Sequence, residues 1–469
     1  MNNEPNIAIL ISNRDFFPDV LIKEARQDLL KLFAELGINP IILDEQDTKL
    51  GALETWHDAV RCGELFRKNR DTIDGVLVSL PNFGDEKAVA DALRTSGLNV
   101  PVLIQAYPDD LDQFGLERRR DAFCGKVSVC NNLRQYGIPF SLTEPHTVRP
   151  STASFRKDLQ QFVAACRLVR GLRGARIGAV GARPNAFNTT RYSEKLLEGA
   201  GISVNTIDLS EVFGRAGKIA DDDVRVRQKL DEIHAYADDA VAPRESLVRM
   251  AKFALVVLDW MSDLGLTATA IQCWSSMQQN FHVNVCTVMS MMSEQFMPSA
   301  CEVDIAGVVS MYALQLASGR PSALVDWNNN YGDDPDKCVL FHCGNWAKDF
   351  LPDIRMGTAP ILGTVLGEQN TFGALAGRTP AGPMTYARIS TDDRNGEIRA
   401  FVGEGQFTDD PLNTFGTKAV VEVKNLQSLM RFICKNGFEH HAAMTSAHVA
   451  ASFEDALTTY LGWNVYRHN

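Results

Sequence analysis

Two acidic residues, Glu302 and Asp326, are the first candidates for chemistry in this chain. Glu302 stands at the head of the apolar helical pattern ACEVDIAGVVSMYAL, and Asp326 ends the hydrophobic run SALVDW. A helix N-terminus keeps a carboxylate ionised, and ligand groups gather at the ends of strands in α/β proteins. Each acid also has a structural explanation, because Ser299 and Glu302 fit an S-x-x-E capping box and Asp326 fits a turn cap.

Three histidines add imidazole donors to these acids. His342 lies in the apolar run CVLFHCGN, and His440 and His441 are adjacent in GFEHHAAMTSAHV. The alternatives are a hydrogen-bonded core histidine and a solvated loop in which histidines cluster by chance. The cysteines near His342 lack the spacing of a zinc knuckle. Carboxylates combined with imidazoles suit a divalent cation such as Mn²⁺, so the set indicates a metal site.

Two further stretches contain side chains that suit a sugar. GARPNAFNTTRY lacks the G-x-G-x-x-G dinucleotide fingerprint. In it we expect Asn188 to be an N-cap, while Arg183 and Arg191 could reach the far end of a sugar or an anionic substituent. QCWSSMQQNF offers the amide of Gln272 and the stacking face of Trp274. Surface arginines and an apolar core helix are the structural alternatives.

Composition restricts the class of protein that contains these residues. The chain has 469 residues, 45% of them hydrophobic, and a formal net charge of −11. This acidity argues against a general nucleic-acid or anionic-membrane binder. The first residues lack the pattern of a signal peptide, and no apolar run reaches the length of a membrane helix. The ten cysteines form no C-x-x-C pair, so we expect reduced thiols and a cytoplasmic protein.

The order of hydrophobic patterns predicts three domains. Strand-like and helix-like runs alternate over residues 1–173, which indicates a parallel α/β domain, and a boundary is expected near Gly174. Residues 174–320 repeat this architecture. Residues 321–469 contain β runs separated by Gly, Pro and Asp turns, with no long helix expected before SFEDALTTYLGW. This last part is predicted to be mostly antiparallel and barrel-like.

Several motifs together resemble one enzyme superfamily. They are FCGKVSVCNNLRQYGIPF, ACEVDIAGVVSMYAL, ALVDWNNN, VLFHCGNW, ARISTDDRNGEIRAFVGEGQ and FEHHAAM. Over essentially its whole length the chain resembles the L-fucose isomerase and L-arabinose isomerase superfamily, in particular the fucose-isomerase-like group. The resemblance implies two Rossmann-like α/β domains followed by a β-barrel-type domain. It also implies a divalent metal, usually Mn²⁺, and interconversion of aldoses and ketoses.

The resemblance also assigns roles to particular residues. Glu302 matches the family's metal-binding glutamate, and Asp326 matches its second acid. His441 matches the imidazole ligand near the C-terminus, with His440 beside it, and His342 stands where arabinose isomerases have a further ligand. An aspartate combined with this extra histidine departs from both parent patterns and leaves the sugar open. The resemblance further implies a homo-trimer or homo-hexamer, in which the first domain of one subunit lines the active site of another.

The chemistry of such an isomerase explains why two acids would be paired. A proton leaves the carbon next to a carbonyl and returns at the neighbouring carbon, through a cis-enediol. A cation offsets the negative charge on the adjacent oxygens, and Glu302 and Asp326 would move the protons. We therefore predict a metal-dependent aldose–ketose isomerase. The alternatives are a non-catalytic sugar-binding protein and a metal-dependent hydrolase with the same ligands.

Overall fold

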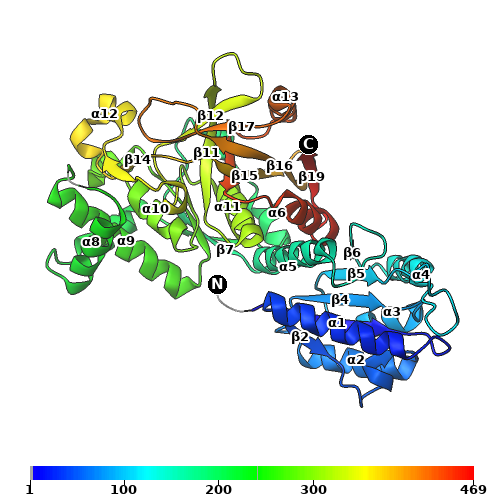
Figure 1. Ribbon diagram of the computed structural model, residues 1–469. Coiled ribbons are helices and arrows are strands. Elements are labelled where there is room, and N and C mark those ends of the chain that lie inside the picture. The colour runs from blue at the N-terminus through cyan, green and yellow to red at the C-terminus, as the bar shows by residue number, and fades with distance from the viewer. Residues whose placement is uncertain (1–3, 240) are drawn as a thin grey trace. The chain divides into compact units, whose positions relative to one another are not determined.

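The computed structural model describes residues 4–239 and 241–469 as an α/β protein made of two compact units (Figure 1). The first unit consists of Met1–Arg170 and Asp455–Gly462, and the second of Gly171–Glu454 and Trp463–Asn469. Parallel sheets come first in the chain and a large mixed sheet comes last. The predicted fold class is therefore confirmed, while the division into three domains stays a prediction.

The first unit contains a six-stranded parallel sheet in the order β2-β1-β4-β5-β6, with β3 also paired to β1. Its strands are β1 (Asn6–Ser12), β2 (Asn39–Ile42), β3 (Ala52–Leu53), β4 (Gly75–Leu80), β5 (Val102–Ala106) and β6 (Ser141–Leu142). Its helices are α1 (Val20–Leu36), α2 (Trp56–Lys68), α3 (Glu86–Ser96), α4 (Ala122–Gln135) and α5 (Ala153–Arg173), the last of which continues into the second unit.

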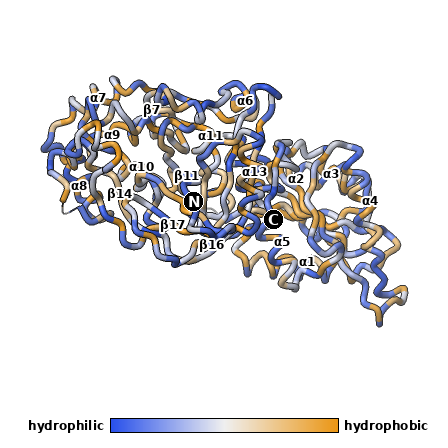
Figure 2. The backbone as a smooth tube through the Cα atoms, turned by 90° about the horizontal axis from the view of Figure 1, so that it is seen from above, coloured by the Kyte–Doolittle hydropathy of each residue, from blue (hydrophilic) through white to orange (hydrophobic). Residues whose placement is uncertain are grey.

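Continuous apolar strands explain why helices cover both faces of this sheet. Alternate residues of β1 and β4 belong to two separate core clusters, as Ala8 and Val76 do on one face and Ile9 and Leu77 on the other. Helices α2, α3 and α4 supply the first cluster, and α1 and α5 the second. Along the helices the chain alternates between hydrophobic and hydrophilic residues (Figure 2), as expected for helices that bury one side.

The second unit begins with a four-stranded parallel sheet in the order β10-β9-β7-β8. Its elements are β7 (Arg176–Val180), α6 (Glu194–Gly199), β8 (Ser203–Ile207), α7 (Leu209–Gly217), α8 (Val224–Tyr236), α9 (Arg244–Leu264), β9 (Ala268–Ile271), α10 (Cys286–Glu294), β10 (Ser299–Ala300) and α11 (Ile305–Ser318). Because these strands are parallel, the carboxyl ends of β7, β9 and β10 meet at one edge, where ligand groups commonly gather.

A nine-stranded mixed sheet completes the second unit, in the order β13-β14-β17-β12-β11-β18-β15-β16-β19. An additional pairing of β16 with β17 closes six antiparallel strands into a ring. Its strands are β11 (Ser322–Asn330), β12 (Lys337–His342), β13 (Arg355–Gly357), β14 (Ala374–Arg378), β15 (Gly382–Asp392), β16 (Glu397–Thr408), β17 (Thr417–Glu422), β18 (His441–Thr445) and β19 (Asn464–His468).

Three helices accompany this sheet, α12 (Pro360–Leu366), α13 (Leu426–Asn436) and α14 (Ala450–Asp455). The expectation that no long helix would precede SFEDALTTYLGW is wrong, because α13 spans 11 residues. Its apolar residues Leu426, Leu429 and Ile433 recur at helical spacing and are buried. Among all the helices in the described ranges, none combines the length and apolar character that crossing a membrane requires.

Close packing inside the ring generates a stability prediction for Gly403. This strand residue pairs with the buried Tyr386, and a Cβ at position 403 would lie 2.5 Å from the Cζ atom of that ring. We expect Gly403→Ala to lower the free energy of unfolding by about 1–3 kcal/mol, the usual range for overpacking. Gly382→Ala, in β15 with no heavy atom within 4 Å of its Cβ, is the matched control and should be neutral or stabilising. Equal effects of the two changes in denaturant titrations would contradict this packing.

Candidate functional site

Glu302 is held at the carboxyl end of β10 by an unusual backbone conformation. Both Glu302 and Val303 have left-handed φ angles, +54° and +53°, which cost L-residues roughly 1–2 kcal/mol each. The Glu302 side chain is buried, with 6% of the residue exposed. Two consecutive strained residues that place one carboxylate are typical of a functional site.

The capping-box interpretation of Glu302 is wrong. Helix α11 begins at Ile305, and its N-cap is Asp304, whose carboxylate accepts a 2.8 Å hydrogen bond from the amide of Gly307. Ser299 lies in β10 and Glu302 precedes the cap by two residues. The carboxylate of Glu302 is therefore not used to begin this helix.

Strand register brings Asp326 and His441 together, and His342 lies at the end of the neighbouring strand. Asp326 lies in the middle of β11, opposite Phe341 of β12 and His441 of β18, so its predicted place at the end of a strand is wrong. His342 follows Phe341 at the end of β12. Directly opposed residues of antiparallel strands share one face of a sheet, which explains why His441 Nε2 lies 3.3 Å from Asp326 Oδ1.

The carboxylate and imidazole groups lie close together, but they do not satisfy the hydrogen-bonding capacity of the carboxylates. Glu302 Oε2 lies 3.9 Å from Nε2 of both His342 and His441, and Asp326 Oδ1 lies 3.5 Å from His440 Nε2. Both carboxylate oxygens are buried and have no hydrogen-bond partner among the described residues. Buried polar atoms normally have partners, so this mixed oxygen and nitrogen set has the composition and spacing of a divalent-metal site.

Asp304, which the sequence interpretation missed, orients His441 through Nδ1, the ring nitrogen on the side away from Glu302 and Asp326. Its Oδ2 atom lies 2.8 Å from His441 Nδ1 and accepts a 2.6 Å bond from Arg388 Nη1. Arg388 also lies 3.2 Å from Glu439, which accepts a 2.9 Å bond from Ser390. A carboxylate that accepts the Nδ1–H of a histidine directs the other ring nitrogen toward a ligand. Aspartate immediately before an apolar helical run was the available signal.

Electrostatics supports an ionised Asp304. Burial acts to raise its pKa, but Arg388 and His441 offset this effect and hold the pKa well below its usual range. For His441, burial acts to lower the pKa, but the hydrogen bond to Asp304 and the nearby carboxylates of Asp326 and Glu302 raise it to about 10. In the metal-free protein His441 is therefore protonated, and a metal ion would displace the Nε2 proton.

The stretch after β9 supports Glu302 and a neighbouring loop, and of the helix considered for it only a short π-helix at Met277–Phe281 is present. Trp274 Nε1 donates a 2.8 Å hydrogen bond to Glu302 Oε1. Gln272 Oε1 accepts a 2.8 Å bond from the amide of Ala182, in the loop after β7. From that loop the ring of Phe187 meets Trp274, His440 and His441, with centroids 5.3–5.8 Å apart. No feature of the sequence indicated Phe187.

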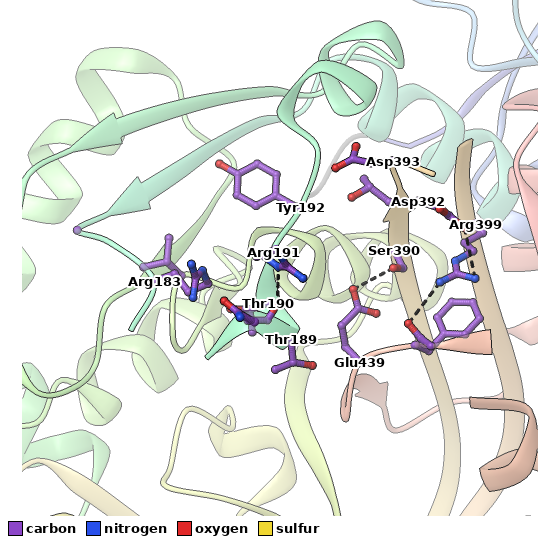
Figure 3. A pocket seen from close by; sticks show the side chains of 16 residues that line it. Arg183, Thr189, Thr190, Arg191, Tyr192, Ser390, Asp392, Asp393, Arg399 and Glu439 are labelled. Carbon is purple, nitrogen blue, oxygen red and sulfur yellow. Dashed lines mark hydrogen bonds and ion pairs between the residues drawn. The ribbon is translucent and has the colours of Figure 1, made fainter. Parts of the chain in front are cut away.

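The second unit contains a cavity of about 800 Å³, and Figure 3 shows the side chains that line it. The loop after β7 contributes Arg183, Asn188 and Arg191, and the opposite wall includes residues of β15 and β16. Asn188 does not cap a helix as expected, because it begins a short 3₁₀ turn without a side-chain cap bond. Glu439 and Val303, both close in sequence to proposed ligands, also line the cavity, so it reaches the surroundings of the cluster.

Comparisons with known proteins agree on one family. The N-terminal domain of fucose/sulfoquinovose isomerases matches residues 8–173, and the C-terminal domain of L-fucose isomerase matches residues 340–469. A sulfoquinovose isomerase of Alkalicoccus urumqiensis is 24% identical over 400 residues, which cover 81% of this chain and 83% of the relative. The sulfoquinovose isomerase of Priestia megaterium is 23% identical over 452 residues, 95% of each chain.

The buried ion pair of Asp304 and Arg388 generates a prediction about stability. Asp304→Asn preserves the shape and the helix cap but leaves a fully buried guanidinium with Glu439 alone. Removing one partner of such a pair costs about 3–5 kcal/mol. We expect a loss near 3 kcal/mol in the free energy of unfolding.

Asp208→Asn is the matched control for this substitution. Asp208 is also an N-cap whose side chain accepts from the helix, but it is exposed and no ion pair of it is seen among the described residues. Asp208→Asn should lower the free energy of unfolding by less than about 0.5 kcal/mol, since asparagine caps a helix as well as aspartate does. Similar losses for Asp304→Asn and Asp208→Asn in calorimetry would show that the ion pair contributes little.

Proposed function

Because the chain belongs to the fucose isomerase-like group of sugar isomerases, we propose that it interconverts an aldose and a ketose through a cis-enediol at a divalent-metal site. The observation that carries this proposal is the pair of buried, unpartnered carboxylate oxygens of Glu302 and Asp326 that face His441 Nε2. Mn²⁺ is the proposed cation, since it accepts carboxylate and imidazole ligands together.

The proposed ligands are Glu302, Asp326 and His441, with His342 as the fourth. His342 Nε2 faces the same Glu302 oxygen as His441 Nε2, at the same distance of 3.9 Å. When bound, the cation would offset the negative charge that develops on two adjacent sugar oxygens. Asp304 and Arg388 are positioning residues in this proposal, because they act through His441.

Glu302 and Asp326 are also the proposed acid–base pair. They reach His441 from different sheets, Glu302 from the parallel edge at β10 and Asp326 from the ring at β11. Their carboxylates would therefore face the sugar from two directions, so that one removes the proton next to the carbonyl and the other serves the hydroxyl groups. Asp326 is on the more open side, with 25% of its side chain exposed, against 8% for Glu302.

His440 and the loop after β7 are proposed to contact the sugar. His440 is the most open member of the cluster, with 41% of its side chain exposed, and its ring meets Phe187 edge to face. Trp274 shares that contact with Phe187, and Gln272 holds the loop in place. The aromatic side chains would thus cover one face of a bound sugar.

The substrate is proposed to be an aldose with an acidic group, of the sulfoquinovose class. The similar proteins are named sulfoquinovose isomerases, and Arg183 and Arg191 line the cavity. Arg183 Nη1 bonds to carbonyls of its own loop, as Arg191 Nε does. For both guanidinium groups, the structure gives the remaining nitrogens no partner within the described parts of the chain, and these N–H groups suit a sulfonate.

We further propose a homo-trimer or homo-hexamer in which the first unit lines a partner's active site. The carboxyl ends of β1 and β4 carry Asn13, Arg14 and Asn82, polar side chains at the edge of a parallel sheet where ligands bind. Asn13 and Asn82 are buried and bonded to one another. A cytoplasmic location stays a prediction.

The metal prediction separates an isomerase from a sugar-binding protein and from a hydrolase. Chelation should abolish ketose formation from sulfoquinovose and from a panel of neutral aldoses, and Mn²⁺ should restore it. Glu302→Gln removes a ligand charge and a base, so turnover should fall by at least about a hundredfold. The exposed Glu64→Gln is the control and should keep full activity. Full turnover after exhaustive metal removal, or in Glu302→Gln, would exclude this mechanism.

The substrate prediction concerns Arg183. Arg183→Ala should raise KM for sulfoquinovose by at least about tenfold, since a hydrogen bond to a charged group contributes about 1.5–3 kcal/mol. KM for a neutral aldose that is also converted should change little. Arg215→Ala, at an exposed residue of α7 that pairs with Glu211, is the matched control. Equal effects on acidic and neutral sugars would remove Arg183 from sulfonate recognition.

A further inference from the structure

Four cysteines pack beside the proposed metal ligands, and the isomerase chemistry uses none of them. Cys273, Cys286 and Cys301 are buried, and Cys343 is partly exposed. All four are free thiols. Cys301 immediately precedes Glu302, and Cys343 immediately follows His342.

His342 joins the thiol cluster to the isomerase site, because its two ring nitrogens face different groups. Its Nε2 atom faces Glu302 Oε2. Its Nδ1 atom lies 3.5 Å from Cys343 Sγ and 3.7 Å from Cys301 Sγ. The thiols therefore surround the nitrogen that the proposed isomerase mechanism leaves free.

These distances match the edges of a tetrahedral thiolate–imidazole site. Zinc lies about 2.3 Å from sulfur and about 2.0–2.1 Å from nitrogen, so tetrahedral edges are roughly 3.6 Å for S···N and 3.8 Å for S···S. The observed S···N distances differ from this edge by about 0.1 Å. All three donor atoms lie within 4.8 Å of one another. Cys286 Sγ lies 3.6 Å from Cys343 Sγ and is therefore a further thiol next to this group.

Sequence spacing gave no sign of this arrangement, because the donors come from separate elements. Cys301 follows β10, Cys343 follows β12 and Cys286 begins α10. Cys343 also lines a small apolar cavity of about 60 Å³ with Phe341 and Ile361, and Ile361 is exposed at the surface. Cys343 therefore borders a cavity that Glu302 does not line.

We propose that Cys301, Cys343 and Nδ1 of His342 form a second cation site, selective for a soft ion of the zinc and cadmium class, with Cys286 or water as the fourth ligand. Thiolates select soft cations, whereas carboxylates suit Mn²⁺. Binding displaces to solvent the protons that the two sulfur atoms and Nδ1 of His342 carry, and the ion gains two sulfur ligands and one nitrogen ligand.

Occupancy of this second site controls which ring nitrogen of His342 carries the proton. A neutral imidazole has one lone pair, so when Nδ1 holds a cation the proton resides on Nε2. Nε2 then donates to Glu302 and no longer binds the metal of the isomerase site. The two cations therefore exclude each other at His342, a consequence that rests on the proposed function.

The binding test uses the metal-stripped full chain and Cd²⁺ alone. Wild-type protein should bind one equivalent with a thiolate-to-cadmium charge-transfer absorption, and cadmium NMR should report two or three sulfur ligands. Cys301→Ser and Cys343→Ser should each weaken binding by at least about tenfold. Cys338→Ser, a buried cysteine on the same strand as His342 and outside the group, is the matched control and should bind normally.

Two results would overturn the second site. One is the absence of sulfur ligands in the cadmium NMR of the wild-type protein, a measurement that needs no folded variant. The other is equal binding by Cys338→Ser, Cys301→Ser and Cys343→Ser. Both can occur while sugar isomerisation proceeds normally, so failure here is distinguishable from failure of the proposed function.

Exclusion at His342 is tested by titrating the protein with Mn²⁺ and measuring the bound Mn²⁺ by electron paramagnetic resonance. Loading with one equivalent of Cd²⁺ should weaken Mn²⁺ binding by at least about tenfold, and the effect should disappear in Cys343→Ser. Unchanged Mn²⁺ affinity in cadmium-loaded wild-type protein would overturn the exclusion.

Discussion

The ion pair between Asp304 and Arg388 is the interaction on which the site geometry depends. Asp304 caps α11 through Gly307, accepts from His441 and binds the guanidinium of Arg388 on β15. The side chains of Asp304 and Arg388 are both fully buried. Gly307 makes room for this ion pair, since a Cβ there would lie 2.6 Å from Asp304 Cγ and 2.9 Å from Arg388 Nη1. A buried charge pair of this kind fixes one arrangement because any partial separation leaves a charge unsolvated.

The ion pair also joins two sheets of different design. The parallel sheet presents Glu302 at the carboxyl end of β10, where a strained backbone turns the side chain inward. The antiparallel ring presents Asp326 and His441 as a cross-strand pair, so their separation follows from register alone. One acid is therefore positioned by local strain and the other by strand pairing, and α11 with its cap holds the two arrangements together.

The sequence predicted regular elements better than their connections. Strands β1, β4 and β5 and helix α1 with its terminal Gly37 follow from apolar runs and a glycine stop. Asp326 looked like the end of a strand because polar asparagines follow it, but β11 continues through those residues. Glu302, Asp326, His342 and His441 were grouped by residue type and family resemblance, and the structure brings them together. Asp304 and Phe187 were missed because their partners lie far away in the sequence.

The ring of β strands has a consequence for biosynthesis. Its closure needs β18 between β11 and β15, and β18 also supplies His441. A chain still emerging from the ribosome without β18 already has Glu302 and Asp326. It lacks the strand that lies between β11 and β15, and it lacks the imidazole of His441. The site therefore cannot assemble before the chain has been translated through β18 (His441–Thr445). A polypeptide that lacks β18 would expose the unpaired edges of β11 and β15.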